Sequence, residues 1–322
     1  MSRIRKRLAI TRRLPEAVLA RAVRDYDAVL NDDDRQLDAD ALVTHIGKAD
    51  GALVCITDRI GRNVVEALAP EVRIISTFSV GTDHIDLEAA RERGIRVGNA
   101  PHGVTIATAE IAMLLILGAA RRASEGEALM RAGAWTGWTP TQLVGRRLDN
   151  RVLGILGMGK IGQALARRAR GFDMAIHYCN RRRLDPSEEQ GAVYHESFQS
   201  LCAVADVISL NAPSTSETRA IVNAATIAWM KPGVIIVNTA RGDLVADDDL
   251  IDALASGRVG YAGLDVYQGE PRVDPRYRGL ANTFLLPHLG SAAVEARNQM
   301  GFEALDNLDA FFDGRSLPFP VA

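Results

Sequence analysis

Three scarcities limit what this chain can be. It has 3 cysteines in 322 residues, too few for a disulfide framework or a metal-binding knuckle, so no metal is expected. Its most apolar stretch, residues 111–120, is far shorter than the roughly 20 residues that cross a bilayer, so we expect no membrane partner. Its net charge is −2 and its sequence pI is about 6.3. A near-neutral chain of this kind does not favour nucleic acid as a partner.

The composition is that of a globular protein large enough for two domains. Hydrophobic residues make up 47% of the sequence and charged residues 24%. The first 15 residues are basic, but they contain no apolar run long enough for a signal peptide. Together with the few, scattered cysteines, this predicts a reducing compartment and a cytoplasmic protein.

Residues 151–183 are the stretch around which the chain is organised. A short apolar run at 152–156 predicts a buried strand, and Gly157-Met158-Gly159-Lys160-Ile161-Gly162 follows as a full G-x-G-x-x-G. A helical pattern over 163–170 and a second apolar run at 174–178 complete a βαβ unit. Gly157 allows the tight turn, Gly159 lets a pyrophosphate approach the backbone, and Gly162 lets helix and strand pack closely. The unit predicts a dinucleotide site at the helix N-terminus, with a purely structural glycine turn as the alternative.

The end of the second strand indicates which dinucleotide binds. An NAD site has an acidic residue about 20 positions past the first glycine, but this chain has Asn180, followed by Arg181, Arg182 and Arg183. A carboxylate would repel a 2′-phosphate, whereas guanidinium groups bind phosphate. We therefore expect NADP(H) to be preferred over NAD(H), with Arg181 and Arg182 on the 2′-phosphate. The alternative is a solvated basic loop.

Strands and helices alternate along the whole chain, which is typical of α/β proteins with parallel sheets. The predicted strands of the first domain are residues 7–11, 28–31, 52–56, 74–78 and 95–99. Those of the second are 152–156, 174–178, 206–210, 234–238, 260–264 and 284–286. We expect two Rossmann-like domains with a cleft between them: a flavodoxin-like substrate domain (1–100 plus 291–322) and a nucleotide-binding domain (101–290). Residues 123–145, which contain Trp135 and Trp138, fit neither sheet and predict a dimerisation arm.

Three reactive side chains follow strands of the second domain. Arg241, Glu270 and His288 come after the runs at 234–238, 260–264 and 284–286. Because neighbouring parallel strands end at one edge of the sheet, these side chains could meet beside a nicotinamide ring. A histidine can supply a proton near neutral pH, a carboxylate can orient it, and an arginine can bind a carboxylate. Each residue taken alone has a structural alternative, an ion pair or a satisfied histidine.

The motifs together resemble the D-2-hydroxyacid dehydrogenases, in particular the glyoxylate/hydroxypyruvate reductase branch. The resemblance covers nearly the whole chain and rests on SVGTDHID, VTIATAEIAMLLIL, WTGWTP, LGILGMGKIGQALARRARGFDM, NAPSTSETRAIVN, MKPGVIIVNTARGDLV, GLDVYQGEP and LPHLGSA, in that order. Two positions depart from the family pattern. Ser79 stands where many members have glycine, and Asn180 stands where most NAD-using members have aspartate.

The resemblance implies a role for each matching residue. His288 would be the acid/base, with Glu270 raising its pKa. Arg241 would bind the 2-oxo acid together with the amides of Val80 and Gly81, and Trp138 would reach the substrate site of the other subunit of a homodimer. Asp265 would lie against the nicotinamide carboxamide. The implied cofactor-binding residues are Thr108, Gly157, Met158, Gly159, Lys160, Ile161, Asn180, Arg181, Arg182, Pro213, Thr218, Thr239, Ala240, Arg241, Asp265, His288 and Gly290.

The expected function is NADPH-dependent reduction of glyoxylate or hydroxypyruvate to the D-2-hydroxy acid. Two alternatives stay open at this point. One is reduction of another 2-oxo acid, such as 2-ketogluconate, by the same chemistry. The other is a binding protein of the kind found among transcriptional corepressors, which resemble this family and sense the dinucleotide without turnover.

Overall fold

The computed structural model describes residues 5–321, which belong to two compact units. Unit 1 comprises Met1–Val104 and Ser291–Ala322, and unit 2 comprises Thr105–Gly290. The sequence places the first boundary after residue 100. In the structure it falls after Val104, where the long helix α5 (Val104–Ala120) begins.

Unit 1 is built on a five-stranded parallel sheet in the order β2-β1-β3-β4-β5. Its strands are β1 (Arg7–Ile10), β2 (Asp27–Leu30), β3 (Gly51–Cys55), β4 (Ile74–Phe78) and β5 (Arg96–Gly98). Leu8 and Ile10 of β1 pack into a core on one face, whereas Ala9 packs into the core on the other. This alternation buries both faces of the sheet, as its apolar strands require. The predicted strands agree with these bounds within a residue or two.

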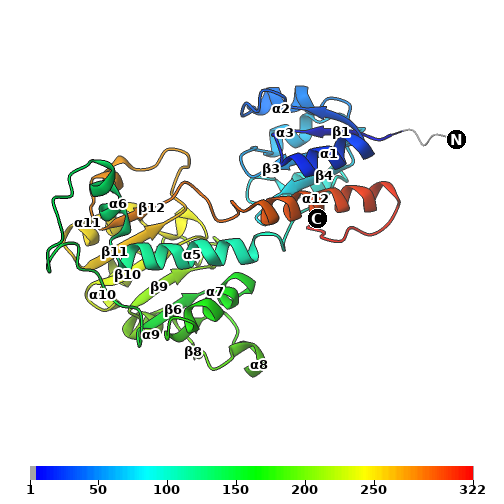
Figure 1. Cartoon of the computed structure of the whole chain (residues 1–322). Helices are drawn as coiled ribbons and strands as arrows, with labels where there is room; N and C mark the ends of the chain where they lie inside the picture. The colour runs from blue at the N-terminus through cyan, green and yellow to red at the C-terminus, as the bar shows by residue number, and fades with distance from the viewer. Residues whose placement is uncertain (1–4, 322) are drawn as a thin grey trace. The chain divides into compact units, whose positions relative to one another are not determined.

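Five helices cover the sheet of unit 1. They are α1 (Glu16–Asp25), α2 (Ala39–Ile46), α3 (Arg62–Ala67), α4 (Leu87–Glu92) and α12 (Val294–Phe312). The last of these returns the chain to its first domain and lies alongside the strands of unit 1 (Figure 1). Gly301 of α12 allows α12 and α1 to pack closely, because a Cβ there would lie 2.4 Å from a methyl group of Val18 in α1.

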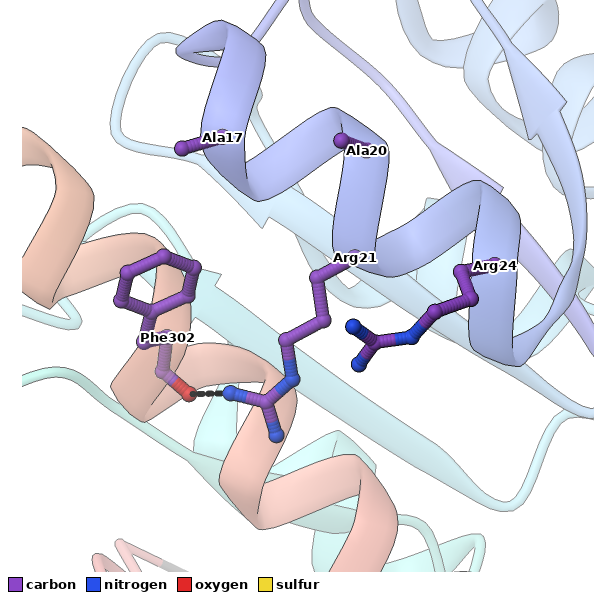
Figure 2. A pocket seen from close by; sticks show the side chains of 5 residues that line it. All are labelled: Ala17, Ala20, Arg21, Arg24 and Phe302. Carbon is purple, nitrogen blue, oxygen red and sulfur yellow. Dashed lines mark hydrogen bonds between the residues drawn. The ribbon is translucent and has the colours of Figure 1, made fainter.

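Arg21 of α1 links α1 to α12 through hydrogen bonds. Its guanidinium donates to Asp306 at 2.7 Å, to Asp309 at 2.6 Å and to the carbonyl of Phe302 at 3.5 Å. An open hollow of about 490 Å³ lies beside this contact, lined by Ala17, Ala20, Arg21, Arg24 and Phe302 (Figure 2). Arg24 is paired with Asp25 at 2.7 Å, so both arginines of the hollow already have carboxylate partners. The hollow therefore offers no unpaired charge for an anion.

Unit 2 is built on a seven-stranded parallel sheet in the order β12-β11-β10-β9-β6-β7-β8. Its strands are β6 (Val152–Leu156), β7 (Ala175–Cys179), β8 (Val193–His195), β9 (Val207–Leu210), β10 (Val234–Asn238), β11 (Val259–Leu264) and β12 (Thr283–Leu285). The prediction of six strands was wrong by one, because it missed β8. That strand has three residues, all at least partly exposed, and it pairs with β7 at the edge of the sheet. An apolar pattern therefore could not reveal it.

Helices pack on both faces of the sheet of unit 2, because residues of α9, α10 and α11 share one core and residues of α5 and α7 share the other. The helices of this unit are α5, α6 (Ala123–Arg131), α7 (Lys160–Arg170), α8 (Pro186–Glu189), α9 (Phe198–Val204), α10 (Ala224–Trp229) and α11 (Asp247–Ala255), with 3-10 turns at Gly242–Leu244 and Pro275–Gly279. Side-chain caps begin two of them, since Ser197 accepts from the N–H of Ser200 and Asn223 forms a capping box with Thr226.

Residues 123–145 form no strand. The helix α6 buries none of its residues, and Trp135 and Trp138 beyond it are 49% and 79% exposed. No single helix among residues 5–321 has the length and apolar composition of a membrane span. The helices α5 and α6 meet those criteria only as a pair bent by 74°.

Candidate active site

Three adjacent strands of unit 2 end beside one another and carry the three reactive side chains. Arg241 follows β10, Glu270 lies in the loop after β11, and His288 follows β12. Arg241 lies within electrostatic reach of this pair, since its positive charge makes a minor contribution that lowers the pKa of both Glu270 and His288. The structure thus brings together the three residues that the sequence predicts at this edge.

Glu270 and His288 form a hydrogen-bonded ion pair. Oε2 of Glu270 lies 2.7 Å from Nδ1 of His288, while Oε1 accepts from the N–H of Tyr267 at 2.8 Å. The hydrogen bond to Glu270 raises the pKa of His288 above its ordinary value, against the lowering effect of burial. For Glu270, burial raises the pKa, but the bond to His288 and its charge outweigh it and hold the carboxyl below its ordinary value. Each partner therefore favours the charged form of the other.

Asp265 holds the backbone that carries His288. Its two carboxylate oxygens accept from the N–H groups of Leu289 and Gly290 at 2.6 and 2.8 Å, and its carbonyl accepts from the N–H of His288 at 2.9 Å. The hydroxyl of Thr108 donates to the carbonyl of Gly290 at 3.0 Å. Burial raises the pKa of Asp265, and the two backbone donors oppose that effect. Asp265 is fully buried, and these hydrogen bonds hold the loop that follows β12.

Arg241 is half-buried and its backbone is fixed by Asn238. The side-chain amide of Asn238 donates to the carbonyl of Arg241 at 2.8 Å, and its Oδ1 accepts from the N–H of Ala240 at 3.0 Å. One guanidinium nitrogen of Arg241 donates to the carbonyl of Ala240 at 2.8 Å. The loop after β10 is thus held by side-chain and backbone bonds that are local to it.

The glycine loop has the geometry that a dinucleotide requires. Gly157 adopts a φ of +93°, and a Cβ there would lie 2.6 Å from the backbone of Ala212. At Gly162 a Cβ would lie 2.5 Å from the carbonyl oxygen of Gly157. At Gly159, the N-cap of α7, a Cβ would meet no atom of the chain within 4 Å. Gly157 and Gly162 are therefore required by the fold, whereas Gly159 leaves open space where a phosphate can approach.

Two buried polar atoms without partners lie at this same edge of the sheet. Oγ1 of Thr239 after β10 and Oδ1 of Asn211 after β9 are buried and accept or donate no hydrogen bond within residues 5–321. Such atoms are costly unless another molecule satisfies them. Together with the open space at Gly159, they fit a bound dinucleotide.

The three arginines of the loop after β7 differ in their contacts. Arg183 is paired with Glu189 at 2.8 Å, whereas Arg181 and Arg182 are exposed and make no ion pair with the described residues. Oδ1 of Asn180 accepts from the N–H of Met158 at 2.6 Å, which ties this loop to the glycine turn. Two of the three cations are thus available to a ligand. Glu189 pairs with Arg183 and so makes it unavailable to a ligand. The sequence did not identify Glu189, because it lies in the four-residue helix α8, which carries no motif.

The other predicted cofactor residues lie on the same edge of unit 2. Thr218 donates to the carbonyl of Pro213 at 2.7 Å, which closes the loop after β9. Lys160 and Ile161 form the first turn of α7. Val80 and Gly81 belong to unit 1, where they follow β4, and Trp138 lies on the exposed segment after α6. The roles of all these residues stay predictions.

Known proteins resemble this chain over nearly its whole length. Residues 113–290 match the family model described as D-isomer specific 2-hydroxyacid dehydrogenase, NAD binding domain. A glycerate dehydrogenase from Hyphomicrobium methylovorum is 49% identical over 99% of both chains, and a glyoxylate reductase from Thermococcus litoralis is 38% identical over 98% of this chain and 96% of that protein. Among solved structures, an NADPH-dependent glyoxylate/hydroxypyruvate reductase from Sinorhizobium meliloti, in complex with NADP and malonate, is 31% identical with a TM-score of 0.88, covering 99% of this chain and 97% of that one.

Proposed function

The chain belongs to the D-isomer specific 2-hydroxyacid dehydrogenase family, and on that premise we propose that it reduces glyoxylate or hydroxypyruvate to the D-2-hydroxy acid with NADPH. The relatives support this substrate class by their names. One is called a glyoxylate reductase, and dehydrogenation of glycerate at its 2-hydroxyl gives hydroxypyruvate.

The ion pair between Glu270 and His288 is the observation that carries the proposal. Reduction of a ketone or aldehyde adds a hydride to carbon and a proton to oxygen, and the nicotinamide supplies the hydride when bound. His288, charged because Glu270 favours that form, supplies the proton to the substrate oxygen from Nε2. In the oxidative direction the neutral imidazole takes the proton from the 2-hydroxyl. The hydrogen bond at Nδ1 directs Nε2 to the substrate in both cases.

Arg241 binds the anionic end of the substrate in this proposal. A guanidinium can hold a carboxylate by two parallel hydrogen bonds, which fixes the carbonyl carbon as well as the charge. The amides of Val80 and Gly81 in unit 1 bind the same carboxylate. Because small 2-oxo acids share this end, Arg241 does not choose among them.

The preference for NADPH rests on the loop after β7. Arg181 and Arg182 are exposed cations beside Asn180, and no carboxylate stands where an NAD site would place one. Arg183 is excluded from the phosphate site because Glu189 holds it. A related enzyme crystallised with NADP supports the same choice of cofactor.

We further propose that the exposed segment 123–145 mediates a homodimer. Met130, Trp135, Trp138 and Val144 are 60%, 49%, 79% and 62% exposed, an unusual concentration of large apolar side chains for a surface that stays in water. Aromatic residues of this kind are favoured at interfaces.

A substrate panel tests the proposed function. Oxidation of NADPH and of NADH is followed with glyoxylate, hydroxypyruvate, pyruvate and 2-ketogluconate, and the configuration of each chiral product is determined. We expect the highest kcat/KM for glyoxylate or hydroxypyruvate with NADPH, and D-glycerate from hydroxypyruvate. Tight NADPH binding without turnover of any of the four would instead support a dinucleotide-sensing protein.

A further inference from the structure

A chain of short hydrogen bonds connects a histidine of unit 1 to the loop after β4. Oγ1 of Thr77 lies 3.0 Å from Nε2 of His84 and 2.8 Å from Oγ of Ser79. Oγ of Ser79 in turn donates to the carbonyl of Gly81 at 2.6 Å. Thr77 and Ser79 are 0% and 3% exposed, so water does not compete at their hydroxyls.

The number of available protons determines the donor and the acceptor in each of these hydrogen bonds. The carbonyl of Gly81 can only accept, so it takes the single hydroxyl proton of Ser79. In the contact between the two hydroxyls, Thr77 must therefore be the donor. With its own proton used, Oγ1 of Thr77 can only accept from His84, which requires a proton on Nε2. The order is Nε2–H of His84 to Thr77, Thr77 to Ser79, and Ser79 to the carbonyl of Gly81.

The carbonyls of the loop are bonded to the protein, but two of its amides are not. The carbonyl of Ser79 accepts from the N–H of Ala100 at 2.9 Å, that of Val80 from the side chain of Asn99 at 2.8 Å, and that of Gly81 from Ser79. Within residues 5–321, the N–H groups of Val80 and Gly81 make no hydrogen bond to the chain. A turn with bonded carbonyls and unused N–H groups is suited to an anion.

We propose that His84, Thr77 and Ser79 are positioning residues, which hold the carbonyl of Gly81 so that the amides of Val80 and Gly81 present their N–H groups to the substrate carboxylate. This inference rests on the proposed function, since it needs a carboxylate substrate. The proposal explains the serine at position 79, because a glycine there would lack the hydroxyl that donates to the carbonyl of Gly81. In this proposal the three residues position the loop and take no part in the proton or hydride transfer.

Matched variants of Thr77 test the proposal in the full-length enzyme. Thr77→Val keeps the shape but removes the hydroxyl, whereas Thr77→Ser keeps the hydroxyl. We expect Thr77→Val to raise KM for the 2-oxo acid by about 3- to 10-fold, the effect of one lost hydrogen bond, with kcat and the Kd of NADPH nearly unchanged. Thr77→Ser should stay within about 2-fold of the wild type on the same scale. Equal KM values for Thr77→Val and the wild type would overturn the proposal.

A second measurement does not depend on activity. Nitrogen-15 NMR of the histidine side chains, with His84 assigned through His84→Gln, reports which ring nitrogen carries the proton. We expect a proton on Nε2 of His84 in the wild type and an altered Nε2 resonance in Thr77→Val. A neutral ring protonated on Nδ1 alone would overturn the order of the bonds. If the wild type turned over no 2-oxo acid while Nε2 was protonated as expected, the proposed function would fail but the bonded loop would stand.

Discussion

Oε2 of Glu270 lies 2.7 Å from Nδ1 of His288, and the other oxygen of the same carboxylate is held at 2.8 Å by the N–H of Tyr267. The carboxylate is therefore fixed before it meets the imidazole. Because Nδ1 of His288 donates to it, Nε2 is the nitrogen that can exchange a proton with a substrate. The backbone of His288 has a φ of +56°, an uncommon conformation for a histidine, and Asp265 stabilises it through three hydrogen bonds.

The first prediction concerns pH. Reduction needs protonated His288, so kcat/KM for the 2-oxo acid should be constant at low pH and fall as pH rises through the pKa of His288. Since Glu270 raises that pKa above 6.5, the fall should lie above pH 6.5 in the wild type. Glu270→Gln should move the fall to lower pH and reduce the rate at pH 8 by about 10-fold or more.

Oxidation of the 2-hydroxy acid provides the control for this pH dependence. It needs neutral His288, so its rate should rise with pH through the same pKa, and Glu270→Gln should move that rise to lower pH as well. If Glu270→Gln did not shift the pH dependence of either rate, a group other than His288 would be the proton donor and acceptor.

The second prediction separates the glycines that the fold needs from the one that the ligand needs. Gly159→Ala meets empty space, so it should lower the free energy of unfolding by no more than about 1 kcal/mol, the cost of a poorer N-cap. It should nonetheless weaken NADPH binding by about 10-fold or more, because the methyl group occupies space near the phosphates. Thermal unfolding and isothermal titration measure the two effects.

Gly162→Ala is the matched comparison for that variant. Its methyl group would lie 2.5 Å from the carbonyl oxygen of Gly157. The free energy of unfolding of the apoprotein should therefore fall by about 1–3 kcal/mol. If Gly159→Ala destabilised the apoprotein as much as Gly162→Ala does, the space above Gly159 would not be a ligand site.

The third prediction concerns the choice of cofactor. Arg181→Ala and Arg182→Ala should each lower kcat/KM for NADPH by about 10- to 100-fold, the loss of a charge-assisted hydrogen bond, and leave kcat/KM for NADH nearly unchanged. Arg183→Ala is the control, because that arginine is paired with Glu189 and should not affect the ratio of the two cofactors. An equal loss with NADPH and NADH would exclude contact with the 2′-phosphate.

The fourth prediction concerns the exposed segment 123–145. Analytical ultracentrifugation should find a dimer at micromolar concentration, and Trp135→Ser combined with Trp138→Ser should shift it toward the monomer. Trp229→Ser is the control, since Trp229 is 39% exposed but lies on α10, outside that segment. A wild-type monomer, or a dimer that both sets of variants leave intact, would contradict the assignment.

Much of the fold could be predicted because local patterns determine it. The apolar runs that form β4, β6 and β10 are buried on both faces, and their bounds match the predicted ones residue for residue. The edge strand β8 could not be predicted, since half-exposed residues such as Tyr194 and His195 carry no apolar pattern. It exists because β7 offers it a partner, which is a tertiary effect.

The candidate site shows the same division. The positions of Arg241, Glu270 and His288 just after predicted strands identified them, because strand ends in such a sheet converge. The contacts that hold these residues were not predictable. Tyr267 reaches Glu270 through its backbone N–H, which any residue other than proline could supply. Asn238 reaches Arg241 through its side chain, but only because the loop after β10 folds back toward it.

The most direct test of the account is turnover by His288→Ala, measured at saturating NADPH and 2-oxo acid beside the Kd of NADPH. We predict a fall in kcat of about 100- to 10,000-fold, the usual contribution of a positioned acid, with cofactor affinity within about 3-fold of the wild type. A variant that bound NADPH normally and kept the wild-type kcat would contradict the account.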